Sequence, residues 1–433
     1  MESLVNGHRH WLLDRRQSLK LAGLAGLSWM TPLGQLLAQQ AQAKPGRPAR
    51  SLILLWMAGG PSQLETFDPH PGKEIAGGTK AIKTNVPGIQ LASGFEPLAE
   101  QADRLAIVRS VVSKEGDHER GTYNVKNGYR PDPTAVHPSI GAILCHELPL
   151  GVPELNIART EIPRHVSILP NQWPGRGGFL GDQYDAFKTF DPASKVPDVT
   201  ARVPDDRFAN RLADLNVVEK SFARGRMQRV ERTRHVETVS DARTMMTTEQ
   251  LAAFEVERES AKLREAYGDT GFGRGCLAAR RLVEVGVRCV EVTLNGWDSH
   301  VNNHATQAER VKELAPAFST LLSDLEERGL LDDTVVVCCG EFGRTPKING
   351  VEGRDHWPHG FSVVLAGGGI RGGQVIGATD PEGGREVEAP VSVGDVHASV
   401  LHACGIDHTK ENISRVNRPI RLAEGEPIPA LFG

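Results

Sequence analysis

Carboxylate and imidazole side chains gather in three short clusters of this sequence. The clusters are Asp117 with His118, Asp298 with His300, and Glu341 followed by Asp355 and His356. Such side chains are common ligands of divalent metals, and they also serve as general acids and bases. If the clusters meet in space, they predict one metal-dependent site. The alternative is that each cluster caps its own helix or turn.

A short apolar run of the kind found in buried strands precedes each cluster. These runs are residues 105–112, 288–294 and 335–339. After the last run, Gly340 allows a sharp turn into Glu341. The carboxyl ends of parallel strands lie at one edge of a sheet, where α/β proteins bind their ligands. We therefore expect the three clusters to converge at that edge.

The rest of the chain alternates between strand and helix patterns. Further strands are expected at residues 51–57, 165–169 and 362–366, and helices at residues 277–285, 305–328 and 395–404. The alternation predicts an α/β fold, with a large, mostly parallel central sheet flanked by helices on both faces. The charged, helical pattern of residues 203–263 indicates a helical insertion within a single domain spanning residues 44–433.

Composition limits the classes of partner. The 433 residues carry a formal net charge of −4 and no basic stripe, which argues against nucleic-acid binding. The six cysteines include no C-x-x-C pair, so neither a disulfide framework nor a zinc ribbon is indicated.

The N-terminal segment has the order of an export signal. Arg15 and Arg16 precede a moderately apolar run at residues 21–37, and an A-x-A cleavage pattern ends at Ala43. Residues 1–43 resemble a twin-arginine signal peptide, and the alternative is a basic amphipathic N-terminus. We expect export to the periplasm or beyond, with the twin-arginine translocase as partner and no stable membrane span after processing.

Four motifs carry a family resemblance. They are GGPSxxxTFDP at residues 59–69, GWDSH at 296–300, GEFGRTP at 340–346 and GRDHWP at 353–358. In order and spacing they resemble domain-of-unknown-function family 1501 (DUF1501), over nearly all of the mature chain. That family is grouped with the alkaline phosphatase and sulfatase superfamily. The resemblance implies an alkaline-phosphatase-like sheet flanked by helices.

The superfamily resemblance also implies metal chemistry, usually with two metals and a hydroxyl or formylglycine nucleophile. Here Gly59 and Gly60 stand where an aspartate usually follows the first strand, and Phe342 cannot ligate a metal. We therefore expect one metal per chain. Cys276 opens a C-x-A-x-R pattern like that used for formylglycine, but its helical surroundings predict a buried thiol.

Together with these clusters, the superfamily resemblance implies a metal-dependent hydrolase of phosphate or sulfate esters, acting on a small-molecule or polysaccharide ester. The alternative is a degenerate superfamily member that binds a sulfated or phosphorylated polymer without cleaving it. The expected metal ligands, for Zn, Mn, Ca or Mg, are Asp298, His300, Glu341, Asp355 and His356. The expected catalytic residues are His118 and Thr122, and the expected substrate-binding residues are Ser62, Arg344, Arg354 and His359.

Two of these assignments have an alternative within the sequence. His304 could replace His300 after a modest change in the path of the loop. Ser62 could cap a helix rather than bind substrate. The arginines are expected to bind an oxyanion in a bidentate manner, and His118 to act as base or nucleophile.

Overall fold

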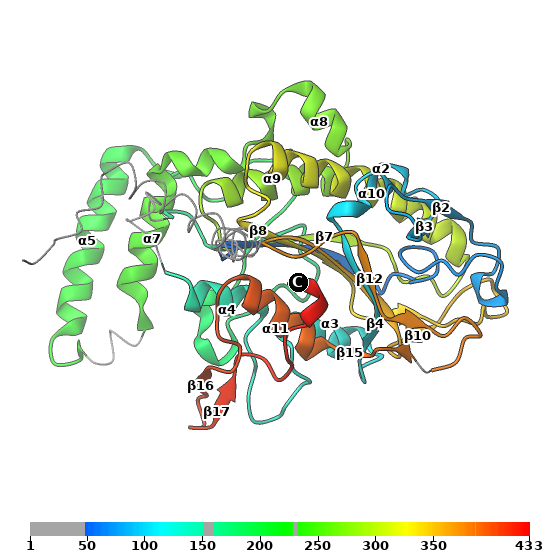
Figure 1. Ribbon diagram of the computed structural model, residues 1–433. Helices are drawn as coiled ribbons and strands as arrows, with labels where there is room; N and C mark the ends of the chain where they lie inside the picture. The colour runs from blue at the N-terminus through cyan, green and yellow to red at the C-terminus, as the bar shows by residue number, and fades with distance from the viewer. Residues whose placement is uncertain (1–47, 150–159, 228–232, 386) are drawn as a thin grey trace, which may run out of the picture. The chain divides into compact units, whose positions relative to one another are not determined.

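The computed structural model describes residues 48–149, 160–227, 233–385 and 387–433 (Figure 1). The expected signal peptide at residues 1–43 lies outside the described residues. Residues 47–433 form one compact unit. Among the described residues, no helix is long and apolar enough to cross a membrane.

A nine-stranded sheet forms the centre of this unit, with strand order β12-β4-β11-β8-β1-β7-β5-β6 and β15 paired to β4. Its strands are β1 (Ser51–Ala58), β4 (Ala106–Val112), β5 (His165–Ile168), β6 (Phe187–Thr189), β7 (Cys289–Asn295), β8 (Thr334–Cys339), β11 (Phe361–Gly367), β12 (Gln374–Ile376) and β15 (Val391–Ser392). All neighbouring pairs are parallel except those of β11, which runs antiparallel to β4 and β8. The mostly parallel α/β fold predicted from the sequence is confirmed.

Strands β1 and β8 lie at the middle of the sheet and are paired in parallel from Ser51↔Thr334 to Trp56↔Cys339. Every residue of both strands is buried. Their unbroken apolar sequences suit this position, because a central parallel strand is covered on both faces and needs no polar side.

Helices cover both faces of the sheet, with α9 and α10 on one face and α4 and α11 on the other (Figure 1). The helices are α2 (Glu96–Ala99), α3 (His118–Asn127), α4 (Ile140–Glu147), α5 (Asp205–Ala223), α7 (His235–Thr247), α8 (Ala261–Tyr267), α9 (Gly271–Glu284), α10 (Asn303–Glu327) and α11 (Val393–Ala403). Each face has its own apolar core, which fixes the flanking helices against the strands.

Residues 203–263 contain α5, α7 and the first residues of α8. In Figure 1, α5 and α7 stand to the side of the sheet. No residue of α5, which is described throughout, is buried.

Shorter elements connect these layers. Two-stranded ribbons are formed by β2 (Ala81–Lys83) with β3 (Gln90–Ala92), β9 (Gly343–Arg344) with β10 (His356–Trp357), β13 (Ala378–Thr379) with β14 (Val387–Glu388), and β16 (Glu411–Ile413) with β17 (Pro419–Arg421). The 3₁₀ helices are Glu74–Ala76, Ala102–Arg104, Gly178–Leu180, Asp182–Tyr184, Glu249–Phe254, Val256–Arg258 and Pro429–Leu431. The β9–β10 ribbon pairs Arg344 with His356, and so joins two of the sequence motifs.

Candidate metal centre

Three neighbouring strands end at the same edge of the sheet and deliver the candidate site. β1 leads to Gly59, β7 leads to Asp298, and β8 leads to Glu341. Helix α3 begins at His118 beside this edge, and its N-terminus is capped by Asp117, whose carboxylate accepts the N–H of Arg120. Asp117 is therefore a helix cap, while its neighbour His118 points into the site.

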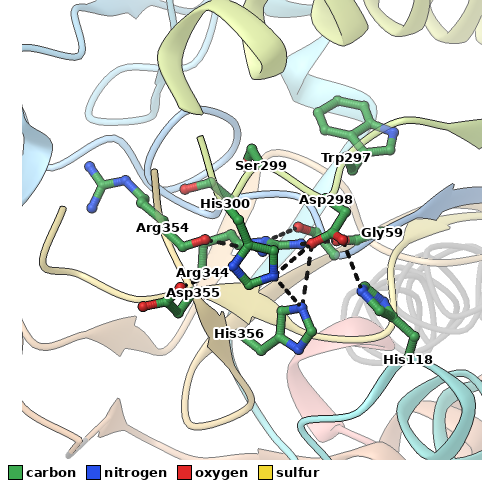
Figure 2. Close-up of polar contacts among 12 residues, drawn as sticks. Gly59, His118, Trp297, Asp298, Ser299, His300, Arg344, Arg354, Asp355 and His356 are labelled. Carbon is green, nitrogen blue, oxygen red and sulfur yellow. Dashed lines mark hydrogen bonds and ion pairs between the residues drawn. The ribbon is translucent and has the colours of Figure 1, made fainter. Parts of the chain in front are cut away.

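One donor atom each from His118, Asp298 and His356 lies within 4.8 Å of the others (Figure 2). We call these three residues the metal group. Asp298 Oδ2 is 3.3 Å from His118 Nε2, and Asp298 Oδ1 is 3.4 Å from His356 Nε2. His118 and His356 are 238 positions apart in the sequence. The fold thus brings together one residue from each of the three clusters.

His300 adjoins the metal group. Its Nε2 atom lies 3.1 Å from Asp298 Oδ1 and 3.0 Å from His356 Nε2. Its Nδ1 atom is 2.9 Å from a carboxylate oxygen of Asp355, which thus lies behind the ring. His304 points elsewhere and pairs with Glu65 at 3.3 Å, so His300 is the histidine that this loop supplies.

Glu341 does not belong to the metal group, although the sequence predicted it as a ligand. Its Oε1 atom is 2.8 Å from His118 Nδ1 and accepts the N–H of Gly59 at 2.9 Å. The carboxylate therefore lies behind the His118 ring and orients it. The hydrogen bond to Glu341 raises the pKa of His118 above its ordinary value, against the opposing effect of burial.

Phe342 and the backbone of Gly116 support the second imidazole. The carbonyl oxygen of Gly116 lies 2.8 Å from His356 Nδ1. The ring centroid of Phe342 is 4.4 Å from that of His356 and 5.2 Å from that of His118. Burial lowers the pKa of His356. Phe342, which cannot bind a metal, thus packs against the two imidazoles of the metal group.

Arg344 holds Asp298 in place from beneath. Its fully buried guanidinium donates to Asp298 Oδ1 at 2.6 Å, to the carbonyl oxygen of Gly60 at 2.9 Å, and to that of Gly59. A further bond at 3.1 Å reaches the carbonyl of Arg354. Burial raises the pKa of Asp298, but the hydrogen bond and charge of Arg344 outweigh it, and the pKa is lowered.

Neither predicted oxyanion-binding arginine is placed to bind a substrate in that way. The Arg344 guanidinium already donates to three carbonyls and a carboxylate. The Arg354 guanidinium is also fully buried, where it bonds Glu65 and the carbonyls of Thr345, Pro346 and Ile75. Both positively charged groups brace loops, because buried carbonyl oxygens need donors.

The remaining predicted site residues lie outside the metal group. Ser62 is fully buried, caps no helix, and its N–H donates to Gln307 at 3.0 Å. Thr122 lies one turn beyond His118 on α3, with a buried hydroxyl that has no partner among the described residues. His359 packs its ring against Trp357, with the centroids 4.9 Å apart. No interaction within the described part of the chain joins these three to the metal group.

Sequence reasoning missed Gln307, which braces the Asp298 loop. Its side chain is fully buried, accepts the Ser62 N–H, and donates to the Trp297 carbonyl at 3.0 Å and the Ser299 hydroxyl at 2.9 Å. A glutamine within helix α10 carries no local signal of such a role, because its partners come from two other segments.

The comparisons with known proteins show the family. A family model described as "Protein of unknown function (DUF1501)" matches residues 49–432, so the chain belongs to that family, as its motifs predicted. No curated protein matches the chain.

Solved structures with a similar arrangement are distant. They include the PsFucS1 sulfatase from Pseudoalteromonas sp. (13% identity, 85% of this chain and 70% of that chain, TM-score 0.35). Others are the lipoteichoic acid synthase LtaP from Listeria monocytogenes (10%, 84% and 73%, 0.37) and the alkaline phosphatase from the Antarctic bacterium TAB5 (10%, 83% and 99%, 0.34). Likeness at this level does not identify a reaction.

Proposed function

We propose that this protein is a metal-dependent hydrolase of phosphate or sulfate esters and a member of the alkaline phosphatase and sulfatase-like superfamily. The observation that carries the proposal is the metal group, in which two imidazoles and one carboxylate converge at the ligand-binding edge of an α/β sheet. The order and spacing of the four sequence motifs support the superfamily placement.

The residues present fit a divalent cation. Neutral imidazole and carboxylate are the ligand types that such cations take in proteins. The side chains of Asp298 and His300 are 43% and 45% exposed, so an ester can approach the group from solvent. A metal held by these residues would act as a Lewis acid, which would polarise the ester oxygen and lower the pKa of bound water.

Each residue of the candidate site has a distinct role in this proposal. His118, Asp298 and His356 hold the metal, with His300 beside them. Arg344 fixes the Asp298 carboxylate, and Glu341 fixes the ring of His118. His118 thus takes a ligand role in place of the catalytic role expected from the sequence.

One observation favours the second candidate function, a protein that binds a sulfated or phosphorylated polymer without cleaving it. The printed side-chain contacts of the metal group in the described residues involve carboxylates, imidazoles, a guanidinium and a backbone carbonyl, and no hydroxyl. The side chains of Ser62 and Thr122 are both buried. A hydrolase of this design must therefore use water as its nucleophile.

The export proposal stands on the sequence. Residues 1–43 act as a twin-arginine signal, so the mature protein meets a small-molecule or polysaccharide ester in the periplasm or outside the cell. The twin-arginine translocase is the partner during export.

Hydrolysis of p-nitrophenyl phosphate and p-nitrophenyl sulfate by metal-loaded protein tests the function. We expect metal-dependent release of p-nitrophenol, and a loss of at least about 100-fold in Asp298→Asn. His304→Gln is the matched control, because His304 lies close by in the sequence, at the start of α10, but pairs with Glu65. A protein that binds metal and a sulfated polysaccharide, yet cleaves neither test ester nor polymer, would establish the second function instead.

A further inference from the structure

The three imidazoles at the site share one arrangement. Each has its Nδ1 atom against an oxygen, from Glu341 at 2.8 Å for His118, from Asp355 at 2.9 Å for His300, and from the Gly116 carbonyl at 2.8 Å for His356. A carboxylate or carbonyl oxygen can only accept, so Nδ1 carries the hydrogen in each ring. The Nε2 lone pairs of the neutral rings are therefore free, and they face the Asp298 carboxylate (Figure 2).

This arrangement is unfavourable unless a cation or an extra proton lies between the rings. His300 Nε2 and His356 Nε2 are only 3.0 Å apart, and in neutral rings with this tautomer two lone pairs would oppose each other. Donor atoms bound tetrahedrally to one zinc ion at about 2.0–2.1 Å lie about 3.3–3.4 Å from each other. Four contacts at the site fall between 3.0 and 3.4 Å. They are His118 Nε2 to Asp298 Oδ2, His300 Nε2 and His356 Nε2 to Asp298 Oδ1, and His300 Nε2 to His356 Nε2.

We propose that the site binds a single transition-metal ion of the zinc type, held by Nε2 of His118, His300 and His356 and by the carboxylate of Asp298. The inference deepens the proposed function and rests on it for the catalytic use of the metal. It adds His300 to the metal group as a fourth ligand. It also replaces the open choice among zinc, manganese, calcium and magnesium with one chemical class.

The ligand atoms favour this class over magnesium and calcium. Imidazole nitrogen suits zinc, cobalt, nickel and copper, whereas magnesium and calcium require six or more oxygen ligands. Asp298 is the only carboxylate in the metal group, and one of its oxygens also binds Arg344 at 2.6 Å. The carboxylates of Glu341 and Asp355 lie behind histidine rings, where they act as the outer hydrogen-bond acceptors of a metal-bound imidazole.

The residues around the site indicate that it binds one metal ion. Gly59 and Gly60 follow β1 and supply no side chain for a second ion. Among the described residues, the metal group is the only cluster of three or more histidine, cysteine or carboxylate side chains whose donor atoms converge closely enough.

Metal titration of the metal-free full-length protein tests the inference without reference to activity. We expect one equivalent of zinc or cobalt to bind by calorimetry and elemental analysis. Bound cobalt should show the visible absorption of a four-coordinate nitrogen and oxygen site. Magnesium or calcium in large excess should neither bind measurably nor displace cobalt.

Two variants locate the ligands, and both are compared with His304→Gln. His300→Gln should lower the affinity for cobalt by at least about 10–100-fold, because removal of a ligand costs no less than loss of an outer partner. Glu341→Gln should lower it by about 10–100-fold. His304→Gln should bind cobalt as the unaltered protein does. If His300→Gln fails to fold, as judged by circular dichroism, Asp355→Asn tests the same ring through its Nδ1 partner.

The outcomes separate this inference from the proposed function. Tight binding of magnesium or calcium, two equivalents of zinc, or an unchanged affinity in His300→Gln would overturn the inference. Ester hydrolysis supported by magnesium alone would also overturn the inference, but it would support the proposed function. Zinc binding through these four residues without ester hydrolysis would confirm the inference and remove the proposed function. A chain that binds none of these metals would overturn both.

Discussion

Asp298 is the carboxylate that contacts both the buried arginine and the imidazoles of the site. It receives a buried guanidinium from one side and three imidazole nitrogens from the other. With Arg344 paired to it, Asp298 has little negative charge left to compensate a cation. The neutral rings must then provide most of the binding, so their protonation controls the site.

Metal affinity should therefore depend on pH in a direction set by His118. The hydrogen bond to Glu341 raises its pKa, and a proton on Nε2 occupies the atom that a metal needs. Affinity should be highest above the raised pKa and fall by about tenfold per pH unit below it, as one proton competes with one ion. Competition titrations with a chelator between about pH 5 and pH 9 measure this.

Glu341→Gln provides the control for the pH effect. The amide oxygen can still accept from His118 Nδ1, but the negative charge that raises the pKa is gone. The fall in affinity should move to lower pH in this variant, in addition to the overall loss. Profiles with the same midpoint in both proteins would contradict the role of Glu341.

The turn after β1 brings backbone close to the residues of the site. At Gly60, φ is +74°, and a Cβ atom there would lie 2.6 Å from the ring of Phe342. That ring packs against His118 and His356, so crowding at the turn would move both imidazoles. A residue without a side chain is required here for space as well as for conformation.

Gly60→Ala and Gly72→Ala form a matched pair for this turn. Gly72 has a similar φ of +81° but no atom within 4 Å of its Cβ position. Both changes should cost about 1–2 kcal/mol of unfolding free energy for the left-handed backbone. Gly60→Ala should cost about 1–3 kcal/mol more from overpacking and should also weaken metal binding. Denaturant unfolding and metal titration of both variants test this, and equal losses would contradict the crowding argument.

Helix α3 carries His118 at its first position and is fixed to the sheet at its other end. Lys126 Nζ donates to Glu291 on β7 at 2.9 Å and to the Trp173 carbonyl at 2.9 Å, and both charged side chains are buried. Burial raises the pKa of Glu291, but the charge of Lys126 outweighs it and holds the pKa well below its ordinary value. This buried pair fixes the helix axis, and thereby the position from which His118 projects.

Lys126→Met should destabilise the fold by about 3–5 kcal/mol, because it removes the cation that is paired with the buried Glu291 carboxylate. That carboxylate then keeps only weaker partners, among them the Ser167 hydroxyl and the Gly175 N–H, each at 3.2 Å. The double variant Lys126→Met with Glu291→Leu should recover much of that loss. Lys312→Met, which breaks an exposed ion pair with Glu309, should change stability by less than about 1 kcal/mol. Denaturant unfolding of these variants, and of Glu291→Leu alone, measures the losses. Additive effects in the double variant would show that the two charges do not interact.

The elements were predictable from the sequence where burial dictates the pattern. The expected strand at residues 335–339 is β8 (Thr334–Cys339), because a central strand needs an unbroken apolar run. The antiparallel direction of β11 was not predictable, since an apolar strand has the same pattern in either direction. Asp298 lies beyond the end of β7 at the predicted edge, whereas His356 reaches it through the β9–β10 ribbon.

The detailed roles within the site depended on tertiary contacts that no local pattern shows. Glu341 follows its strand as expected, yet the approach of α3 places His118 between it and Asp298. Arg344 and Arg354 lie in polar motifs that suggested contact with substrate. Their partners are mostly backbone carbonyls, which every residue has and which no sequence pattern marks.

At the scale of the whole molecule, the site exists only in the folded chain. His356 Nδ1 and the Gly116 carbonyl that orients it are 240 positions apart, and Asp298 comes from a third segment. An unfolded chain holds no preformed site, so metal binding stabilises the folded state. We therefore expect the proposed metal to bind with or after folding and not to the unfolded chain.

The proposed export route agrees with that requirement, because the twin-arginine pathway carries folded proteins. Replacement of Arg15 and Arg16 by lysine should leave the full-length chain in the cytoplasm, with residues 1–43 attached. Cell fractionation and mass measurement of the retained chain test this. Residues 47–433 form a compact unit of their own, so we expect the retained variant to bind its metal. Normal processing of the double-lysine variant would contradict the signal interpretation, whereas retention of a metal-free chain would place metal uptake after export.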